Sequence, residues 1–121
     1  MLEFCEQIVA APTAQDVWAV HLRTMAHYGF DRLLYGFTRF RTESGFGDPD
    51  DFLIMTNHSR AYIDSFLHEG HYFNAPMVRW AATHVGACSW RRLGEYPETL
   101  TEPERRVVEF NRKHDVVAGY T

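Results

Sequence analysis

The histidine and cysteine side chains are the residues of this sequence best suited to catalysis or metal binding. His68 and His71 flank Glu69 in "HEGH", but this spacing differs from the H-E-x-x-H of zinc hydrolases and supplies only two ligands. Cys88 lies near His84, and no orienting acid or oxyanion loop accompanies this pair. We therefore expect no enzyme activity, no catalytic residue, no bound metal and no cofactor.

The two cysteines, Cys5 and Cys88, stand far apart in the sequence. Neither belongs to a metal-binding spacing such as C-x-x-C, and disulfides are rare in intracellular proteins. We expect both to be free thiols.

Composition and charge predict one globular domain without a nucleic-acid-binding surface of its own. The chain has 121 residues, of which 45% are hydrophobic and 15% aromatic, enough for one core and too few for two domains of usual size. The net charge is −4 at pH 7 and the arginines are spread along the chain, so any DNA contact would need another segment. No stretch approaches the length of a membrane span, and we expect a cytoplasmic protein.

Capping signals and apolar periodicity predict four helices. Thr13 with Asp16 resembles a capping box and opens a helix that ends at Gly29. Thr101 with Glu104 makes another capping box. The predicted helical segments are 13–29, 59–70, 75–84 and 101–114.

Runs of β-forming residues predict a hairpin and two further extended segments. "RLLYGFTRFR" (32–41) and "DFLIMTN" (51–57) are separated by a glycine- and acid-rich stretch, which is typical of a hairpin with a long loop. "ACSW" (87–90) is a brief strand or extended piece, and "DVVAGYT" (115–121) is a strand. Because such a strand needs partners, we expect the domain to continue past Thr121. These elements indicate an α+β fold, an α/β/α sandwich with helices on both faces of an antiparallel sheet.

Three aromatic residues, a proline and a glycine stand at specific spacings from residue 62 onward. They lie in "AYIDSFLHEGHYFNAPMV", "ACSW" and "LTEPERRVVEFNRKHDVVAGYT", and the pattern consists of Tyr62, Phe66, Pro76, Trp90 and Gly119. It resembles the autoinducer-binding domain of LuxR-type quorum-sensing transcription regulators. That family has a tryptophan, a tyrosine four residues later, an Asp-Pro, a serine- or threonine-tryptophan and a late glycine. The resemblance covers roughly residues 13–121.

The resemblance implies a fold, a function and a set of partners. It implies a sheet of about five antiparallel strands between helices, with the last strands outside this sequence. It also implies that residues 1–121 form a sensing domain in which an acyl-homoserine lactone lies between the sheet and the middle helices. Such bacterial regulators are homodimers that contact DNA through a helix-turn-helix domain, which this chain does not contain.

Several positions depart from the family pattern. The resemblance places Tyr62 at the tryptophan that donates to the lactone carbonyl, and His58 at the tyrosine that bonds the acyl carbonyl. Ala75 falls at the aspartate that accepts the ligand amide, in a helix-capping position that favours Asp, Asn or Ser. An unpaired amide costs about 1–3 kcal/mol, so we expect altered ligand specificity unless Asn74 supplies the acceptor. Asp115 replaces a glycine that usually follows the last helix.

Strand alternation and the family pattern together predict the ligand pocket. Alternation puts Ile54, Thr56 and His58 on one face of their strand, and Gly36 leaves room beside the backbone of the other strand. The alternative is that these residues form an ordinary core. The predicted ligand-binding residues are Leu34, Gly36, Thr38, Ile54, Thr56, His58, Tyr62, Phe66, Asn74, Ala75, Met77, Val78 and Trp90.

Two other functions fit the same sequence. The first is a ligand-independent dimerisation or interaction module whose pocket is filled by bulky side chains. The second is a GAF- or PAS-like sensor of an unrelated ligand, although this does not explain the spacing from Tyr62 to Trp90. A sensor is expected to contain a cavity of a few hundred cubic ångströms between the sheet and the helices, and an interaction module is not.

Overall fold

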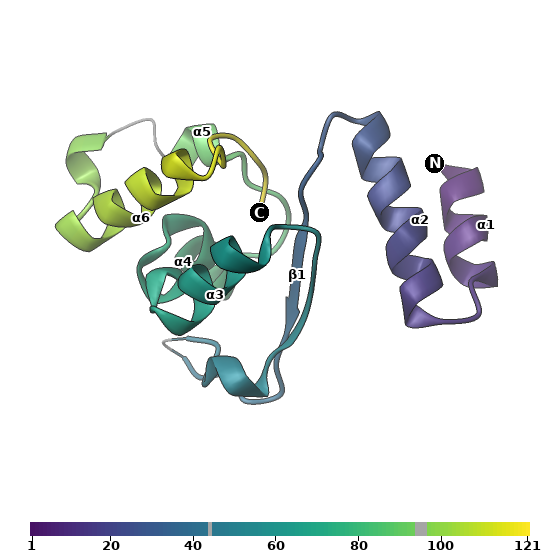
Figure 1. Cartoon of the computed structure of the whole chain (residues 1–121), viewed down its shortest axis with the longest axis horizontal. Helices are drawn as coiled ribbons and strands as arrows, with labels where there is room; N and C mark the ends of the chain where they lie inside the picture. The colour runs from purple at the N-terminus through teal and green to yellow at the C-terminus, as the bar shows by residue number, and fades with distance from the viewer. Residues whose placement is uncertain (44, 94–96) are drawn as a thin grey trace. The chain divides into compact units, whose positions relative to one another are not determined.

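A computed structural model describes residues 1–43, 45–93 and 97–121 of the chain (Figure 1). Within these residues it has six α-helices and one antiparallel sheet of two strands, which confirms a mixed α+β fold. None of the described helices is long and apolar enough to cross a membrane. The elements are α1 (Leu2–Ala10), α2 (Ala14–His27), β1 (Leu34–Phe37), η1 (Pro49–Asp51), β2 (Leu53–Thr56), α3 (Arg60–His68), η2 (His71–Asn74), α4 (Pro76–Thr83), α5 (Trp90–Leu93), η3 (Pro97–Thr99) and α6 (Glu102–Lys113), where η marks a 3-10 turn.

The chain divides into two compact units. The first unit holds Met1–Phe37 and Leu53–His58, which include α1, α2 and both strands. The second unit holds Thr38–Phe52 and Ser59–Thr121, which include α3 to α6. The segment that connects β1 to β2 therefore belongs to a different unit from the strands themselves.

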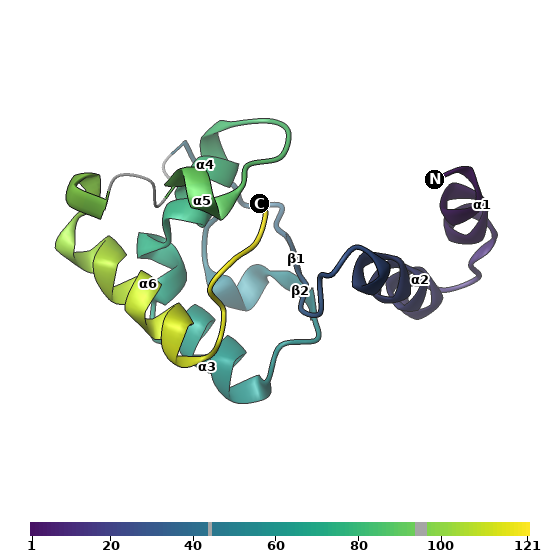
Figure 2. The ribbon, with the colours of Figure 1, turned by 90° about the horizontal axis from the view of Figure 1, so that it is seen from above.

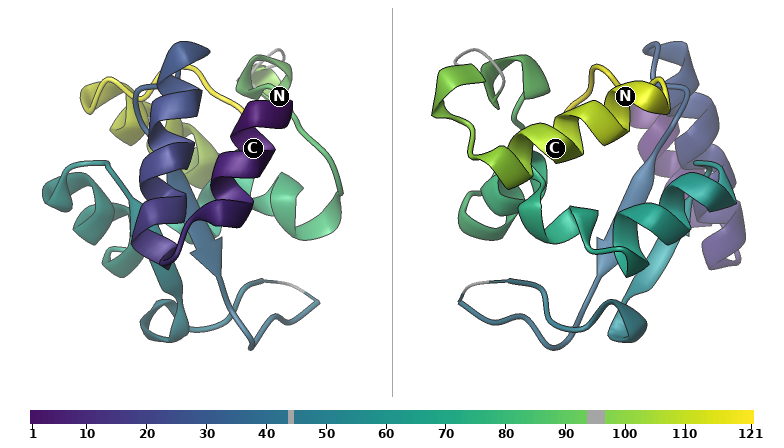
Figure 3. Two further views of the ribbon diagram at one scale, coloured as in Figure 1. Left: turned by 90° about the vertical axis from the view of Figure 1, so that its right-hand side faces the viewer. Right: turned by 60° about the vertical axis from the view of Figure 1, so that its left-hand side comes forward.

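In the first unit, α1 and α2 lie side by side (Figures 1 and 3). The start of α2 is confirmed, because Thr13 Oγ1 accepts a hydrogen bond from the Asp16 N–H at 3.1 Å. The rings of Phe4 and His21, one from each helix, lie 6.1 Å apart. The sequence analysis did not predict α1. No side chain caps the start of this helix, and none of its residues is buried.

The predicted hairpin is confirmed, with strands shorter than predicted. β1 and β2 pair antiparallel, with Leu34 opposite Thr56 and Gly36 opposite Ile54. Opposed residues of antiparallel strands share a face, so these four positions lie on one face of the sheet, as their alternation predicts. The first and last residues of both predicted runs lie outside the paired segments.

In the second unit, α3 and α6 pack against each other (Figure 2). Ser59, the first residue of the predicted helical segment 59–70, caps α3, because its Oγ accepts from the Tyr62 N–H at 3.2 Å. The capping box of α6 is complete: Thr101 N–H donates to Glu104 Oε2 at 2.8 Å, and Glu104 N–H donates to Thr101 Oγ1. The buried residues of α6 lie on one face of the helix and are Glu104, Val107 and Asn111.

The strand predicted over 115–121 is largely wrong, whereas the brief strand or extended piece predicted over 87–90 is confirmed as far as Ser89. Segments 87–90 and 115–121 are joined by one bridge between Ser89 and Tyr120 and by two backbone hydrogen bonds between Cys88 and Thr121, at 2.7 and 2.9 Å. A third backbone hydrogen bond runs from the Trp90 N–H to Gly119 O. Trp90 begins the short helix α5 instead of ending a strand. The segments are extended but have no further strand beside them among the described residues, so the five-stranded sandwich remains a prediction.

Two helices end in the same hydrogen-bonding pattern with different residues at the left-handed position. After α2, Gly29 has a φ of 89°, and the Phe30 N–H donates to Met25 O at 3.0 Å. After α6, Asp115 has a φ of 57°, and the Val116 N–H donates to Asn111 O at 2.9 Å. Both are Schellman motifs, in which glycine is the favoured residue.

We predict that Asp115→Gly raises the free energy of unfolding by about 0.5 kcal/mol, because the left-handed conformation is strained for a residue with a Cβ. Asp115→Asn should give a smaller gain, because it removes a negative charge from the carboxyl end of α6. Urea unfolding followed by circular dichroism measures both changes. The matched control is Gly29→Ala, which places a Cβ at the equivalent position of α2 and should destabilise. An Asp115→Gly variant less stable than the parent would contradict the prediction.

Candidate functional site

The phenol group of Tyr62 forms a buried hydrogen bond within the second unit. It is 5% exposed, and its O–H donates to Oδ1 of Asn111 on α6 at 2.9 Å. Asn111 is itself 3% exposed. The hydrogen bond therefore satisfies two buried polar groups and links α3 to α6. Donation from Tyr62 to a ligand, which the family resemblance implies, remains a prediction.

An aromatic cluster surrounds this hydrogen bond. The Tyr62 ring stacks on Phe66 within α3, with ring centres 5.5 Å apart, and on Phe110 of α6 at 5.3 Å. His114 meets the Tyr62 ring edge-on at 5.4 Å, and His71 stacks on Phe110 at 4.1 Å. Tyr62 and Phe66, both predicted site residues, thus come together in the core between α3 and α6.

The beginning of α4 confirms the unusual helix start. Ala75 is the N-cap residue, no side chain caps the helix, and Pro76 occupies the first turn. Ala75 is 1% exposed, whereas Asn74 is exposed and belongs to η2. The helix starts without a slip, so Asn74 does not take the capping position. Val78, also predicted as a site residue, is half-buried in α4.

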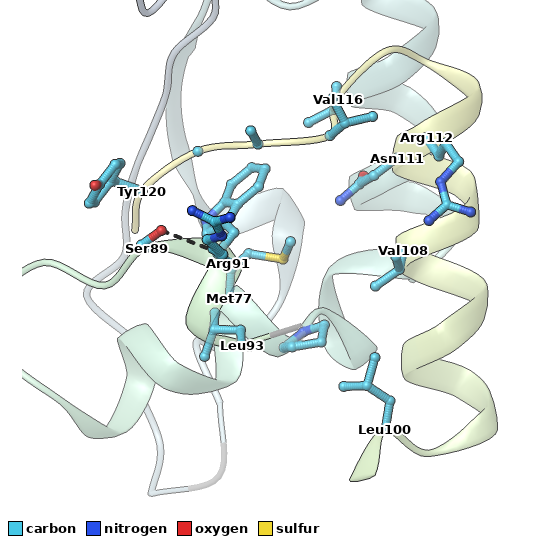
Figure 4. A pocket seen from close by; sticks show the side chains of 15 residues that line it. Met77, Ser89, Arg91, Leu93, Leu100, Val108, Asn111, Arg112, Val116 and Tyr120 are labelled. Atoms are coloured by element: carbon cyan, nitrogen blue, oxygen red, sulfur yellow. Dashed lines mark hydrogen bonds between the residues drawn. The ribbon is translucent and has the colours of Figure 1, made fainter. Parts of the chain in front are cut away.

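A hollow of about 600 Å³ lies within the second unit, and we call it the C-terminal hollow (Figure 4). Of the predicted site residues, Met77 from α4 and Trp90 from α5 line it. Its other walls come from α6 and from the extended segment after α6. The lining residues are Pro76, Met77, Ser89, Trp90, Arg91, Leu93, Leu100, Val108, Asn111, Arg112, Val116, Val117, Ala118, Gly119 and Tyr120.

Trp90 fixes one wall of the C-terminal hollow. Its indole N–H donates to Thr121 Oγ1 at 2.7 Å, and its backbone N–H donates to Gly119 O at 3.0 Å. A Cβ added at position 119 would lie 3.2 Å from three atoms of the Trp90 ring. Close packing against the indole therefore explains why glycine occurs at this position.

The hairpin side chains predicted to face a ligand lie in the first unit, apart from Thr38. Ile54 Cδ1 lies 3.4 Å from where a Cβ of Gly36 would stand, so the Ile54 side chain covers the space that Gly36 leaves. Leu34 is 41% exposed. Thr38 follows β1, and its Oγ1 accepts from the Phe40 N–H at 3.1 Å. A pocket between the sheet and the helices remains a prediction.

His58 follows β2 and is half-buried. Its backbone N–H donates to Thr56 Oγ1 at 3.1 Å, and that hydroxyl donates to Leu33 O at 2.7 Å. Burial lowers the pKa of His58 and the Arg32 guanidinium lowers it further, while Asp31 acts in the opposite direction. At neutral pH the lowered pKa favours the neutral imidazole, which can both donate and accept a hydrogen bond.

The remaining histidines and cysteines form no common site. His68 Nδ1 lies 3.9 Å from Asp50 Oδ1, and His84 stacks on the Trp80 indole with ring centres 4.9 Å apart. Both Cys5 and Cys88 are free thiols, as predicted. Among the described residues, no group of three or more His, Cys, Asp and Glu side chains could hold a metal ion.

Comparison with family models identifies the family of the chain. The model of the family described as "Autoinducer binding domain" matches residues 13–121. The chain belongs to this family. Comparisons with curated proteins and with solved structures gave no match. Membership in the autoinducer-binding domain family indicates a ligand-binding domain of quorum-sensing regulators, with a small molecule as its partner.

The sequence did not predict several of the residues that line the C-terminal hollow of this autoinducer-binding domain. Asn111, Val108 and Arg112 come from α6, and Leu100 lies just before it. The signal that could have found Asn111 is its place on the apolar stripe of α6, seven residues after Glu104, because polar side chains on a buried face need partners.

We predict that Tyr62→Phe lowers the free energy of unfolding by about 1–3 kcal/mol, because it leaves Asn111 Oδ1 buried without its donor. Chemical denaturation measures the change. Tyr28→Phe is the control, because Tyr28 is 60% exposed and its hydroxyl should contribute little. The double variant Tyr62→Phe/Asn111→Leu should recover part of the loss. Equal, small effects of Tyr62→Phe and Tyr28→Phe would contradict the prediction.

We predict that the pKa of His58 makes stability depend on pH near neutrality. Its pKa in the folded state lies below the ordinary value of 6.5, so the unfolded chain binds the proton more readily between the two values. The free energy of unfolding should therefore fall as the pH drops through this window. His58→Gln should flatten the pH dependence measured by urea unfolding between about pH 7.5 and 5.5. Exposed His27 provides the control variant His27→Gln, and an unchanged slope in His58→Gln would contradict the assignment.

Proposed function

We propose that this autoinducer-binding domain is the small-molecule sensing domain of a LuxR-type transcriptional regulator. The observation that carries the proposal is the C-terminal hollow, since it contains Met77 and Trp90 in a chain that belongs to the family. A volume of about 600 Å³ lies in the range of small-molecule sites. The ligand is an apolar molecule similar to an acyl-homoserine lactone. The domain itself catalyses no reaction.

The composition of the hollow supports an apolar ligand. Leu93, Leu100, Val108 and Val116 supply aliphatic walls, and Trp90 supplies an aromatic one. Such a surface binds an acyl or aryl group by removing it from water. The polar side chains of the lining could orient a ligand by hydrogen bonds, and they are Ser89, Arg91, Asn111, Arg112 and Tyr120.

Ala75 supports altered specificity within the proposed function, because it directly precedes Pro76, which lines the C-terminal hollow, although Ala75 itself is not a lining residue. Its methyl group offers no acceptor to the amide of an acyl-homoserine lactone, and α4 starts at this residue without a slip. A ligand amide left unpaired in a buried site costs about 1–3 kcal/mol, or roughly one to two decades in affinity. The natural ligand therefore does not depend on a carboxylate at position 75.

The same proposal includes how the regulator contacts DNA. The net charge of −4 gives these residues no basic surface for DNA, so a separate helix-turn-helix domain makes the DNA contact. The regulator acts as a homodimer in the bacterial cytoplasm.

We predict that a bound lactone or aryl lactone raises the midpoint of thermal unfolding. A ligand at a hundredfold excess over its Kd stabilises the folded state by about 2.7 kcal/mol. Ala118→Trp, which adds a bulky ring to the lining of the hollow, should abolish the shift. Exposed Ala87 lies outside the lining and gives the matched control Ala87→Trp, which should keep the shift.

A further variant tests the role of position 75. Ala75→Asp should raise the affinity for N-octanoyl-homoserine lactone about tenfold by restoring an acceptor for the amide. No shift with lactones, aryl lactones or extract of the host cell would contradict sensing and favour the ligand-independent interaction module. A shift with extract alone would contradict the lactone-like ligand.

A further inference from the structure

The charged side chains in the C-terminal hollow are all of one sign. Two of its 15 lining residues are arginines, Arg91 and Arg112, and none of the 15 is acidic. The whole chain carries the opposite net charge, −4. The positive lining is therefore a local property of the hollow, not a reflection of overall composition.

The two arginines line the hollow from different elements. Arg91 belongs to α5 and Arg112 to the last turn of α6, and Figure 4 draws them on opposite sides of the hollow. Within the part of the chain that the structure describes, neither forms an ion pair. In contrast, Arg79, Arg105 and Arg106 all pair with glutamates. Among the described residues, no acidic side chain therefore neutralises the two arginines of the hollow, and the same holds for Arg23, Arg39, Arg41 and Arg92 elsewhere in the chain.

Several neutral polar atoms nearby already take part in hydrogen bonds. The Trp90 indole N–H donates to Thr121, and Asn111 Oδ1 accepts from Tyr62. The Ser89 hydroxyl oxygen accepts the Arg91 backbone N–H at 3.3 Å. The guanidinium groups are therefore the strongest hydrogen-bond donors that the hollow offers to a ligand, and they suit a carboxylate, which can accept two parallel bonds.

We propose that the C-terminal hollow selects an anionic amphiphile, with an apolar body and a carboxylate head, over the corresponding neutral lactone. This inference rests on the proposed function, because it assigns the ligand class of the same site. The aliphatic walls hold the body, and Arg91 and Arg112 attract the head. A charge-assisted hydrogen bond is roughly twice as strong as a neutral one, and it weakens with added salt where the site is open.

Two probes that differ only at the head group test the inference. N-octanoyl-homoserine has a free carboxylate, ionised at neutral pH, and N-octanoyl-homoserine lactone is its neutral ring-closed form. Calorimetric titration of the full chain should show the acid binding about tenfold or more tightly than the lactone at low salt, with the ratio shrinking as salt screens the charges.

Charge-matched double variants separate the hollow from the overall charge of the chain. Arg91→Gln/Arg112→Gln removes both cations of the hollow and should weaken acid binding about tenfold while changing lactone binding little. Arg92→Gln/Lys113→Gln removes the same total charge from neighbouring positions outside the lining and should preserve the preference. A circular dichroism spectrum of each variant confirms that the fold is retained.

The outcomes distinguish this inference from the proposed function. A parent chain that binds the lactone as tightly as the acid overturns the inference and leaves the sensing function standing. A preference for the acid that survives Arg91→Gln/Arg112→Gln also overturns it, because the cations then lie elsewhere. A chain that binds neither probe nor any other small molecule overturns both.

Discussion

The packing of α6 is the constraint on which the second unit depends. Its inward face carries two buried polar side chains, Glu104 and Asn111, on either side of Val107. A buried polar group without a partner is destabilising, so each requires a specific neighbour. Glu104 accepts from the Thr101 N–H and pairs with Arg79 of α4, while Asn111 accepts from Tyr62 of α3. These contacts fix α3 and α4 against one helix.

The same constraint shapes the proposed ligand site. The ion pair between Arg79 and Glu104 holds α4 and α6 together. Met77 of α4 and Val108 of α6 therefore both line the C-terminal hollow. Asn111 contributes to both the core and the hollow. The phenol of Tyr62 is engaged by that residue, so a ligand that needed its proton would have to compete with an existing buried hydrogen bond. Within the proposed function, this competition and the methyl group of Ala75 are the two reasons to expect a ligand specificity that differs from the family type.

Local signals predicted the elements best where the chain itself supplies the hydrogen-bond partner. Ser59, Thr13 and Thr101 each lie next to the backbone N–H that they accept from, and all three helix starts were predicted. The segment 115–121 was predicted as a strand because its residues favour β structure, yet only Tyr120 forms a bridge. A strand depends on a neighbour that local sequence does not specify. The lining of a hollow likewise depends on neighbours that local sequence does not specify. Met77 and Trp90 were predicted with the help of the family resemblance, whereas Leu100 and Arg112 were not predicted.

The sequence by itself determined the α+β class, the helix starts, the uncapped beginning of α4 at Ala75 and, through the spacing of its aromatic residues, the family. These properties depend on contacts between residues close in the chain or on pattern alone. Only the tertiary structure decided that Tyr62 bonds Asn111, that Ile54 covers Gly36, and that two arginines without acidic partners among the described residues line one hollow. Tyr62 and Asn111 are 49 positions apart, and Arg91 and Arg112 lie on different helices. Such pairs are brought together by helix packing, which follows from the burial of many side chains at once and not from any short stretch of sequence.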